Sequence, residues 1–233
     1  SCATQPAQII CAASSTSRSV LRFALLLTLL GSFISCGDSR TDGPDPAITM
    51  TAAPAGADSS EIWQQQCGVC HGEAGEGNRT LGAPALTQLS SGYLARQLTH
   101  FVNGVRGTDP KDQAGHRMAL SVALLAPSDI PALAAFISTD LPPARPEATR
   151  KGDAARGQDY YTHLCSACHG SNALGNPILG APALAGASDW YLKSSYQGFL
   201  DGLRGQHADD VYGAQMARLA PALPDEDDLD DVI

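Results

Sequence analysis

The chain has 233 residues, 43% of them hydrophobic, with a formal net charge of −9 and seven cysteines. This length has room for two small domains. The acidic balance excludes a nucleic-acid-binding protein, which needs positive charge to neutralise phosphates. It is compatible with electrostatic docking to a basic patch on a protein partner.

Residues 1–36 are typical of a signal peptide or a short membrane anchor. Two arginines flank the start of an apolar run over residues 23–34, which has the length of a signal h-region and is short for a membrane span. The run ends beside Cys36, as in a bacterial lipoprotein signal that places lipid on this cysteine, although Phe33 stands where an aliphatic residue is usual. An ordinary cleaved signal peptide and an uncleaved anchor are the alternatives.

The composition then divides the chain into a tether and two domains. Residues 37–58 are rich in Gly, Pro, Ala and Asp and are expected to form a flexible tether. We expect a first domain at 59–140 and a second at 152–233. The segment 141–151 between them contains several prolines and is predicted to be a stiff linker.

Each domain carries one C-x-x-C-H pattern near its start. The two copies lie 98 residues apart and consist of Cys67, Cys70 and His71 in the first domain, and Cys165, Cys168 and His169 in the second. Two thiols three residues apart on one helical turn reach the two vinyl groups of one porphyrin, and the adjacent histidine then lies under the iron. The sequence therefore predicts two covalently bound haem c groups.

Two other interpretations of the cysteine pairs are a thioredoxin-like dithiol and half of a zinc site. A redox dithiol needs a βαβ context, which this sequence does not predict. A zinc ribbon places its two cysteine pairs about 15–20 residues apart, far closer than the 98 residues here. Haem attachment is the favoured interpretation.

The sequence after each motif repeats at the same offset without a gap. The stretch Leu-Gly-Ala-Pro-Ala-Leu occurs at residues 81–86 and again at 179–184. The pattern Phe-x-x-Gly-x-Arg-Gly occurs at 101–107 and again at 199–205. Two copies of this length indicate the duplication of one domain rather than a solenoid.

The local patterns are helical, and no stretch alternates well enough to predict a sheet, so we expect an all-α fold with a few short helices around each haem. Asp153 is expected to cap a motif-bearing helix over 154–164, with Asp58 to Ser60 serving the first domain. Middle helices are expected at 91–103 and 189–201. A last helix in the first domain is expected after Ser128, its N-cap, to about residue 137.

The closing helix of the second domain is expected to begin only at Leu229, so that it looks cut short by about a turn at Ile233. Six acidic residues lie between Asp225 and Asp231. Acidic side chains are favoured near a helix N-terminus, and we expect these to face water rather than to form a docking patch.

Met118 and Met216 are the predicted distal ligands. Each lies 47 residues after its motif histidine and is followed by alanine, and the chain has only three methionines. Methionine opposite histidine gives an electron-transferring haem and raises its potential, whereas core filling is the commoner role of a lone methionine. The four non-motif histidines, His116 among them, have no counterparts in the repeat; His116 is the one rival ligand because it is close to Met118.

Other residues that occur in both copies of the repeat are candidates to contact the motif histidines or the haem. The carbonyls of Pro84 and Pro182 are candidate acceptors for the second ring N–H of the motif histidines. Arg106 and Arg204 are candidate partners for haem propionates, with a solvated loop position as the alternative. The aromatic residues of the middle helices are expected to be packing residues rather than redox relays: Tyr93, Trp190 and Tyr191.

On these motifs, residues from about 58 to 233 resemble a di-haem class I cytochrome c of the cytochrome c-four group. The resemblance implies two all-helical cytochrome folds related by a pseudo-twofold axis. It implies that one haem is held by Cys67, Cys70, His71 and Met118, and the other by Cys165, Cys168, His169 and Met216. It also implies that Pro84 and Pro182 orient the histidines.

The resemblance implies an electron-transfer protein of the respiratory chain rather than an enzyme. Such a protein passes single electrons between periplasmic or membrane partners, toward a terminal haem-copper oxidase or from a quinol-oxidising complex. The segments 189–192 and 213–216 also resemble cytochrome domains fused to haem-copper oxidase subunits. The expected location is the periplasmic side of a bacterial membrane, through lipid on Cys36, or else the soluble periplasm.

The alternative function is a di-haem redox enzyme of the cytochrome peroxidase or thiosulfate dehydrogenase type. Such an enzyme needs an open or exchangeable distal position, or a cysteine or second histidine there. Both copies of the repeat offer a methionine instead, which favours the electron carrier.

Overall fold

The computed structural model describes residues 56, 58–145, 148–149 and 151–233, which belong to one compact unit, Thr49–Ile233. The predicted signal, the lipid on Cys36 and nearly all of the predicted tether lie outside the described residues. Among the residues described, none of the helices is long and apolar enough to cross a membrane. The same residues are helical or irregular, with only two isolated β-bridges, Asn78–Ala83 and Asn176–Ala181.

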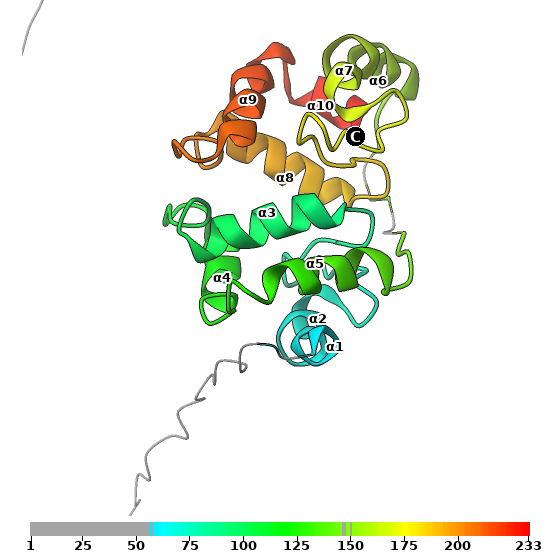
Figure 1. Ribbon diagram of the computed structural model, residues 1–233. Helices are drawn as coiled ribbons and strands as arrows, with labels where there is room; N and C mark the ends of the chain where they lie inside the picture. The colour runs from blue at the N-terminus through cyan, green and yellow to red at the C-terminus, as the bar shows by residue number, and fades with distance from the viewer. Residues whose placement is uncertain (1–55, 57, 146–147, 150) are drawn as a thin grey trace, which may run out of the picture. The chain divides into compact units, whose positions relative to one another are not determined.

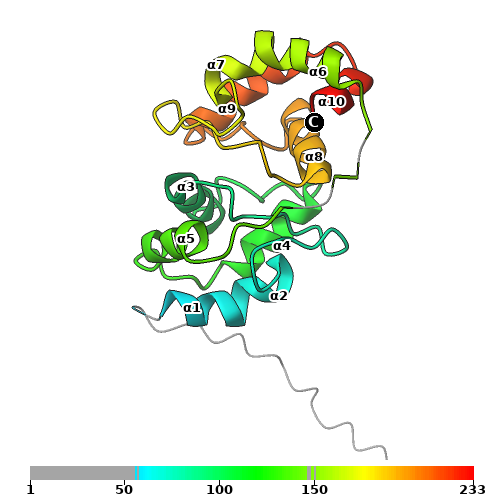
Figure 2. The same cartoon turned by 90° about the vertical axis from the view of Figure 1, so that its right-hand side faces the viewer.

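The helices of the first domain follow the expected order (Figure 1). They are α1 (Ser59–Ile62), a π-helical turn (Trp63–Cys67), α2 (Gly68–His71), α3 (Ser91–Val102), α4 (Gln113–Ser121) and α5 (Ile130–Thr139). The longest pair, α3 and α5, packs side by side in both views (Figures 1 and 2). This pair and α1 supply the core.

Capping side chains fix where these helices begin. The carboxylate of Asp58 accepts from Ser60 N at 2.8 Å, so α1 starts where the sequence predicts. For α5, however, the predicted N-cap Ser128 is wrong by one residue. Asp129 is the N-cap, and the hydroxyl of Ser128 donates to its carboxylate at 3.3 Å.

The first domain has an apolar core built from the inward faces of its helices. Its largest members are Ile62, Trp63, Leu94, Leu98, Phe101, Val122, Leu125, Ile130, Leu133 and Ile137. Each large aliphatic side chain fully removed from water stabilises the fold by about 1.5–3 kcal/mol. The spacing of Leu94, Leu98 and Phe101 is that of one face of a helix, which is why α3 packs inward along its whole length.

The second domain repeats this order. Its elements are α6 (Ala154–Tyr160), a π-helical turn (Tyr161–Cys165), α7 (Ser166–His169), α8 (Asp189–Leu200), α9 (Val211–Leu219), a 3-10 turn (Ala220–Ala222) and α10 (Glu226–Val232). Asp153 caps α6 as predicted, accepting from the backbone of residues 155 and 156. The helix predicted over 154–164 is α-helical only to Tyr160 and continues as the π-helical turn Tyr161–Cys165. The first domain has its π-helical turn, Trp63–Cys67, at the equivalent place.

The closing helix α10 begins at Glu226, three residues before the predicted start at Leu229, because Asp225 caps it by accepting from Asp228 N at 2.9 Å. It packs against α6, as both views show (Figures 1 and 2). Leu229 is buried in this contact. The helix therefore forms part of the second domain's packing.

The prediction that the acidic residues of this segment face water is wrong for two of them. The side chains of Asp228 and Asp231 are only 8% and 5% exposed, and the guanidinium of Arg156 pairs with both. The ammonium of Lys193 pairs with Glu226 and, at 2.9 Å, with Asp230. Ion pairs with Arg156 of α6 and Lys193 of α8 thus hold these carboxylates against neighbouring helices. The local sequence alone does not predict these ion pairs.

Candidate functional site

The two motif histidines are held in the same way in both domains. Nδ1 of His71 donates to the carbonyl oxygen of Pro84 at 2.8 Å, and Nδ1 of His169 donates to that of Pro182 at 2.9 Å. Both rings are buried. Because a carbonyl only accepts, Nδ1 carries the proton, and the lone pair of Nε2 is left to bind a metal.

A close approach of two backbone segments puts the proline carbonyl in place. Gly77 and Gly175 follow the motifs with φ of +87° and +83°. A Cβ on Gly77 would lie 2.6 Å from Ala85 N and 2.8 Å from the carbonyl carbon of Pro84. Only glycine fits such a left-handed, crowded position, so these residues hold the proline loop against the histidine.

The environment keeps both imidazoles neutral. Burial lowers the pKa of His71, and the carbonyl of Pro84 only partly offsets this. Burial likewise lowers the pKa of His169 against the effect of Pro182. A neutral imidazole is the form that binds a metal.

The first cysteine of each motif, Cys67 and Cys165, ionises less readily than a free thiol. Cys67 is half-buried and Cys70 is exposed, and none of the four motif cysteines is in a disulfide. Burial, with a contribution from Cys70, raises the pKa of Cys67 to about 12, and burial also raises the pKa of Cys165. A redox dithiol needs the opposite shift, so the thioredoxin-like alternative is disfavoured.

The zinc alternative finds no support in the arrangement of side chains either. Over the part of the chain that the structure describes, no three or more His, Cys, Asp or Glu residues group in a way that would hold a metal ion. In the second domain the structure instead places one histidine, His169, and one methionine, Met216, on the wall of one cavity.

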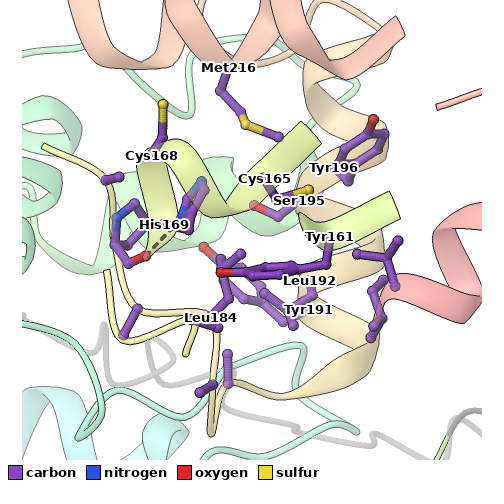
Figure 3. Close-up of a pocket in the computed structure, with 18 of the residues that line it drawn as sticks. Tyr161, Cys165, Cys168, His169, Leu184, Tyr191, Leu192, Ser195, Tyr196 and Met216 are labelled. Atoms are coloured by element: carbon purple, nitrogen blue, oxygen red, sulfur yellow. Dashed lines mark hydrogen bonds between the residues drawn. The ribbon is translucent and has the colours of Figure 1, made fainter. Parts of the chain in front are cut away.

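Met216 and His169 reach the same cavity from different elements (Figure 3). Met216 comes from α9, and His169 from the end of α7. In the first domain Met118 of α4 is half-buried and packs, together with Cys67, against the apolar core. The rival ligand His116 is exposed, and its ring lies 3.3 Å from the carbonyl oxygen of Gly107.

The short helices that carry the methionines are elements that the sequence reasoning missed. Each begins with an aspartate whose carboxylate accepts from a glycine N–H three residues on, Asp112 from Gly115 at 2.8 Å and Asp210 from Gly213 at 2.9 Å. The repeated Asp-x-x-Gly spacing before Met was the available signal, because aspartate is a favoured N-cap.

The cavity that His169 and Met216 line measures about 740 Å³, and first-domain residues such as Tyr93 and Arg96 form part of its wall. Its apolar walls include Leu184, Leu192, Phe199 and Leu219, with Tyr161 and Tyr196 beside them. Among the described residues of this domain, few apolar residues are buried, namely Ala183, Ala220 and Leu229. A volume of this size suits a cofactor, and a large flat apolar group such as a porphyrin would complete the interior.

The repeat arginines stack on repeat phenylalanines rather than extending into solvent. The guanidinium carbon of Arg106 lies 4.6 Å from the ring centre of Phe101, and that of Arg204 lies 4.4 Å from the ring centre of Phe199. Both arginines are half-buried. A cation over an aromatic face is held in place by the charge distribution of the ring.

Each arginine also leaves one donor without an acceptor. Nη1 of Arg106 donates to Gln97 at 2.7 Å, and Nη1 of Arg204 donates to the repeat-equivalent Ser195. The Nε atoms of both arginines are buried, and neither has a hydrogen-bond partner among the described residues. A buried guanidinium N–H calls for an acceptor, and a carboxylate such as a haem propionate has the right charge and shape.

Comparison with known proteins agrees with this geometry. The model of the cytochrome c family matches residues 56–140 and 154–233. The Cbb3-type cytochrome c oxidase subunit FixP of Bradyrhizobium sp. (strain ORS 278) is 34% identical over 147 residues, which is 60% of this chain and 47% of that protein. The chain thus spans about half the length of the curated relatives it matches.

Two solved structures share the arrangement of helices. Thiosulfate dehydrogenase (TsdBA) from Marichromatium purpuratum is 28% identical, with a TM-score of 0.57, over 75% of this chain and 38% of that one. Cytochrome c4 from Acidithiobacillus ferrooxidans is 23% identical, with a TM-score of 0.56, over 72% of this chain and 94% of that one. The second likeness supports the fold, two tandem cytochrome c domains.

Proposed function

Because the chain belongs to the cytochrome c family, whose model matches both of its halves, we propose that it is a di-haem electron carrier. It passes single electrons between redox partners and has no substrate chemistry of its own. The observation that carries the proposal is a buried histidine fixed by a proline carbonyl in each domain, at 2.8 and 2.9 Å, together with Met216 on the wall of the cavity that His169 also lines.

The chain carries two covalently bound haem c groups, which supply iron that alternates between the ferrous and ferric states. We assign the two sets of holding residues as Cys67, Cys70, His71 and Met118, and Cys165, Cys168, His169 and Met216. The cavity of about 740 Å³ and the unpartnered Nε atoms of Arg106 and Arg204 fit such a group. The domain bounds 59–140 and 152–233 stay a prediction.

The protein's own groups set the potential and exclude water. The carbonyls of Pro84 and Pro182 fix the histidine rings and raise their basicity by accepting the Nδ1 proton. A methionine thioether in the distal position favours the ferrous state and raises the potential. His71 and Met118 would hold one iron and His169 and Met216 the other, and such a ligand set would leave no position for a substrate.

The proposed acceptor is a haem-copper oxidase, with a quinol-oxidising complex as the proposed donor. The support is that FixP, 34% identical over 147 residues, is a subunit of a Cbb3-type cytochrome c oxidase. We further propose that the protein works on the periplasmic side of the membrane, held there by lipid on Cys36. Incorporation of a palmitate analogue that is lost in Cys36→Ala tests the anchor separately.

The main test uses protein purified from cells that mature c-type cytochromes. We expect a haem-to-polypeptide ratio of two and rapid oxidation of the ferrous protein by membranes that contain a haem-copper oxidase. The oxidation should stop when the oxidase is inhibited with cyanide. A ratio far from two, or ferrous protein that such membranes do not oxidise, would overturn the proposal.

A second candidate function is thiosulfate oxidation, because the likeness to thiosulfate dehydrogenase from Marichromatium purpuratum covers 75% of this chain. The two distal methionines argue against it, since an enzyme needs an exchangeable position. Thiosulfate added to the ferric protein should therefore leave the haems oxidised. Catalytic reduction by thiosulfate, or turnover of hydrogen peroxide, would favour the enzyme.

A further inference from the structure

The hydroxyl of Tyr191 connects the two domains at the level of the repeat arginines. Nη2 of Arg106, from the loop after α3, donates to Oη of Tyr191 at 3.3 Å. Tyr191 belongs to α8 and lines the cavity of the second domain (Figure 3). One arginine of the first domain thus reaches the wall of the other domain's cavity.

The connection continues along α8 to the second arginine. Ser195 lies one helical turn after Tyr191, on the same face of the helix, and it is among the groups that lower the pKa of the Tyr191 phenol. Its Oγ accepts from Nη1 of Arg204. Arg106 is thus held by Tyr191 and Arg204 by Ser195, two residues that are neighbours on one face of α8.

The pKa of Tyr191 shows that the positive charges of both guanidinium groups act on its hydroxyl. Burial alone would raise the pKa of this phenol. The positive charges of Arg106 and Arg204 outweigh that effect, and the pKa of Tyr191 falls to about 7. The phenol oxygen is therefore an electron-rich acceptor placed between two cations.

The duplication produced two equivalent tyrosines, but only one makes this bridge. Tyr93 occupies the position of Tyr191 in the first domain. Its ring lies 5.3 Å from the guanidinium carbon of Arg96. Within the described part of the chain, its hydroxyl makes no hydrogen bond to Arg204 or to any other group. Tyr93 therefore offers a matched control.

We propose that Tyr191 is a positioning residue that couples the two haem sites, because its hydroxyl binds Arg106 directly and lies beside Ser195, which binds Arg204. The inference rests on the proposed function, because it takes both arginines to serve haem carboxylates through their unpartnered Nε atoms. A change of charge or position at one arginine then alters the other through the phenol. The duplicated domains act as one electrostatic unit rather than as two independent carriers.

The test is a redox titration of the holoprotein with the two haems resolved. Met216→His, which replaces a thioether by an imidazole and lowers the potential of one haem, assigns the two waves. In Tyr191→Phe we expect both potentials to rise, because the guanidiniums lose an electron-rich partner and disfavour ferric iron. Tyr93→Phe removes a phenol that lines the same cavity without bonding to either arginine, and it should move both potentials less than Tyr191→Phe does.

A double-mutant cycle isolates the role of the bridge. Arg106→Lys should shift the potential of the second haem when Tyr191 is present, and should leave it unmoved in the Tyr191→Phe background. The inference is overturned if Tyr191→Phe changes only one potential, or if the remote effect of Arg106→Lys survives without the phenol hydroxyl.

Folding and haem loading are checked separately. Each variant should keep two haems per chain, low-spin spectra and the far-ultraviolet circular dichroism of the parent protein. Unmoved potentials in a fully loaded, low-spin protein reject the bridge and leave the proposed electron carrier standing. A parent protein without two low-spin haems rejects the proposed function itself.

Discussion

His100 of α3 and Asp210, the N-cap of α9, face each other across the two cytochrome domains, with the imidazole Nδ1 3.7 Å from the carboxylate Oδ1. Both residues are buried. The same carboxylate accepts from Gly213 N at 2.9 Å and so begins the helix that carries Met216. A side chain of the first domain therefore touches the support of the second domain's distal ligand.

The burial of His100 predicts that acid weakens the fold. Burial lowers the pKa of His100; Asp210 opposes the shift, while Arg96, Arg106 and His207 add to it. The unfolded chain has a histidine pKa of about 6.5, so the folded state binds this proton less readily. The resulting stability is present above about pH 6.5 and is lost as the pH falls through the lower, folded value.

Thermal unfolding of the holoprotein between pH 7.5 and 5 measures the effect. The melting temperature should fall over this range, and His100→Gln should make the fall shallower because glutamine does not titrate. His163→Gln is the matched control, since the His163 side chain is 70% exposed and its neighbouring carboxylate, Asp159, is exposed too. An equal slope in the parent protein and His100→Gln would contradict this prediction.

The distal ligands give the second prediction. Met118→Ala and Met216→Ala should each convert one haem to a high-spin state and lower its potential, because a thioether is replaced by water or by no ligand. Optical and electron paramagnetic resonance spectra report the spin state haem by haem. His116→Ala should leave both haems low-spin, since the exposed ring lies beside the carbonyl of Gly107. Low-spin spectra in both methionine variants would refute the ligand assignment.

The parts of the fold that the sequence predicts are those that local patterns determine. Asp153 before α6 and the apolar face of α3 predict helices at their observed places. Local patterns do not predict the two helices that carry the methionines, α4 and α9. They have nine residues each, with a glycine near the start of α4 and of α9, so neither length nor helix propensity distinguishes them from a loop.

Contacts between distant segments account for what could not be predicted. Tyr191 was expected to be a packing residue. Its hydrogen-bond partner Arg106 lies 85 positions away and in the other domain, so the local sequence does not predict this contact. Asp228 and Asp231 were expected to face water, and they turn inward because Arg156 lies on the helix packed against them. Only the tertiary structure brings these charges together.

The glycine that crowds the proline loop gives the third prediction. A Cβ on Gly175 would lie 2.6 Å from Ala183 N and 2.7 Å from the carbonyl carbon of Pro182, at a φ of +83°. Gly175→Ala should therefore cost about 1–3 kcal/mol in the free energy of unfolding. It should also displace the Pro182 carbonyl from His169, which makes the imidazole less basic and raises the potential of the second haem.

A second glycine in the chain supplies the control for this experiment. Gly92 lies in α3, and a Cβ there would meet nothing within 4 Å. Gly92→Ala should stabilise the protein by up to about 1 kcal/mol, because alanine is the better helix former. Denaturant unfolding together with a redox titration measures both variants. Equal effects of the two substitutions would show that crowding at Gly175 is unimportant.

The inward-turned acids of α10 give the last prediction. Arg156→Ala should lower the melting temperature at pH 7, because Asp228 and Asp231 would keep their buried carboxylates without the cation from α6. The hydrogen bond from Arg156, followed by that from Asp153 N, lowers the pKa of Asp231. The unfolded value for aspartate is about 3.9.

The stabilisation by this pair is therefore present above about pH 4 and is lost as the pH falls through the lower, folded value of Asp231. Melting curves of the parent protein and Arg156→Ala should accordingly differ at pH 7 and converge toward pH 3. Arg145→Ala, at an exposed position of the linker, should leave the melting temperature unchanged at both values. A difference between parent and Arg156→Ala that persists undiminished at pH 3 would mean that the arginine acts through packing of its aliphatic stem and not through its charge.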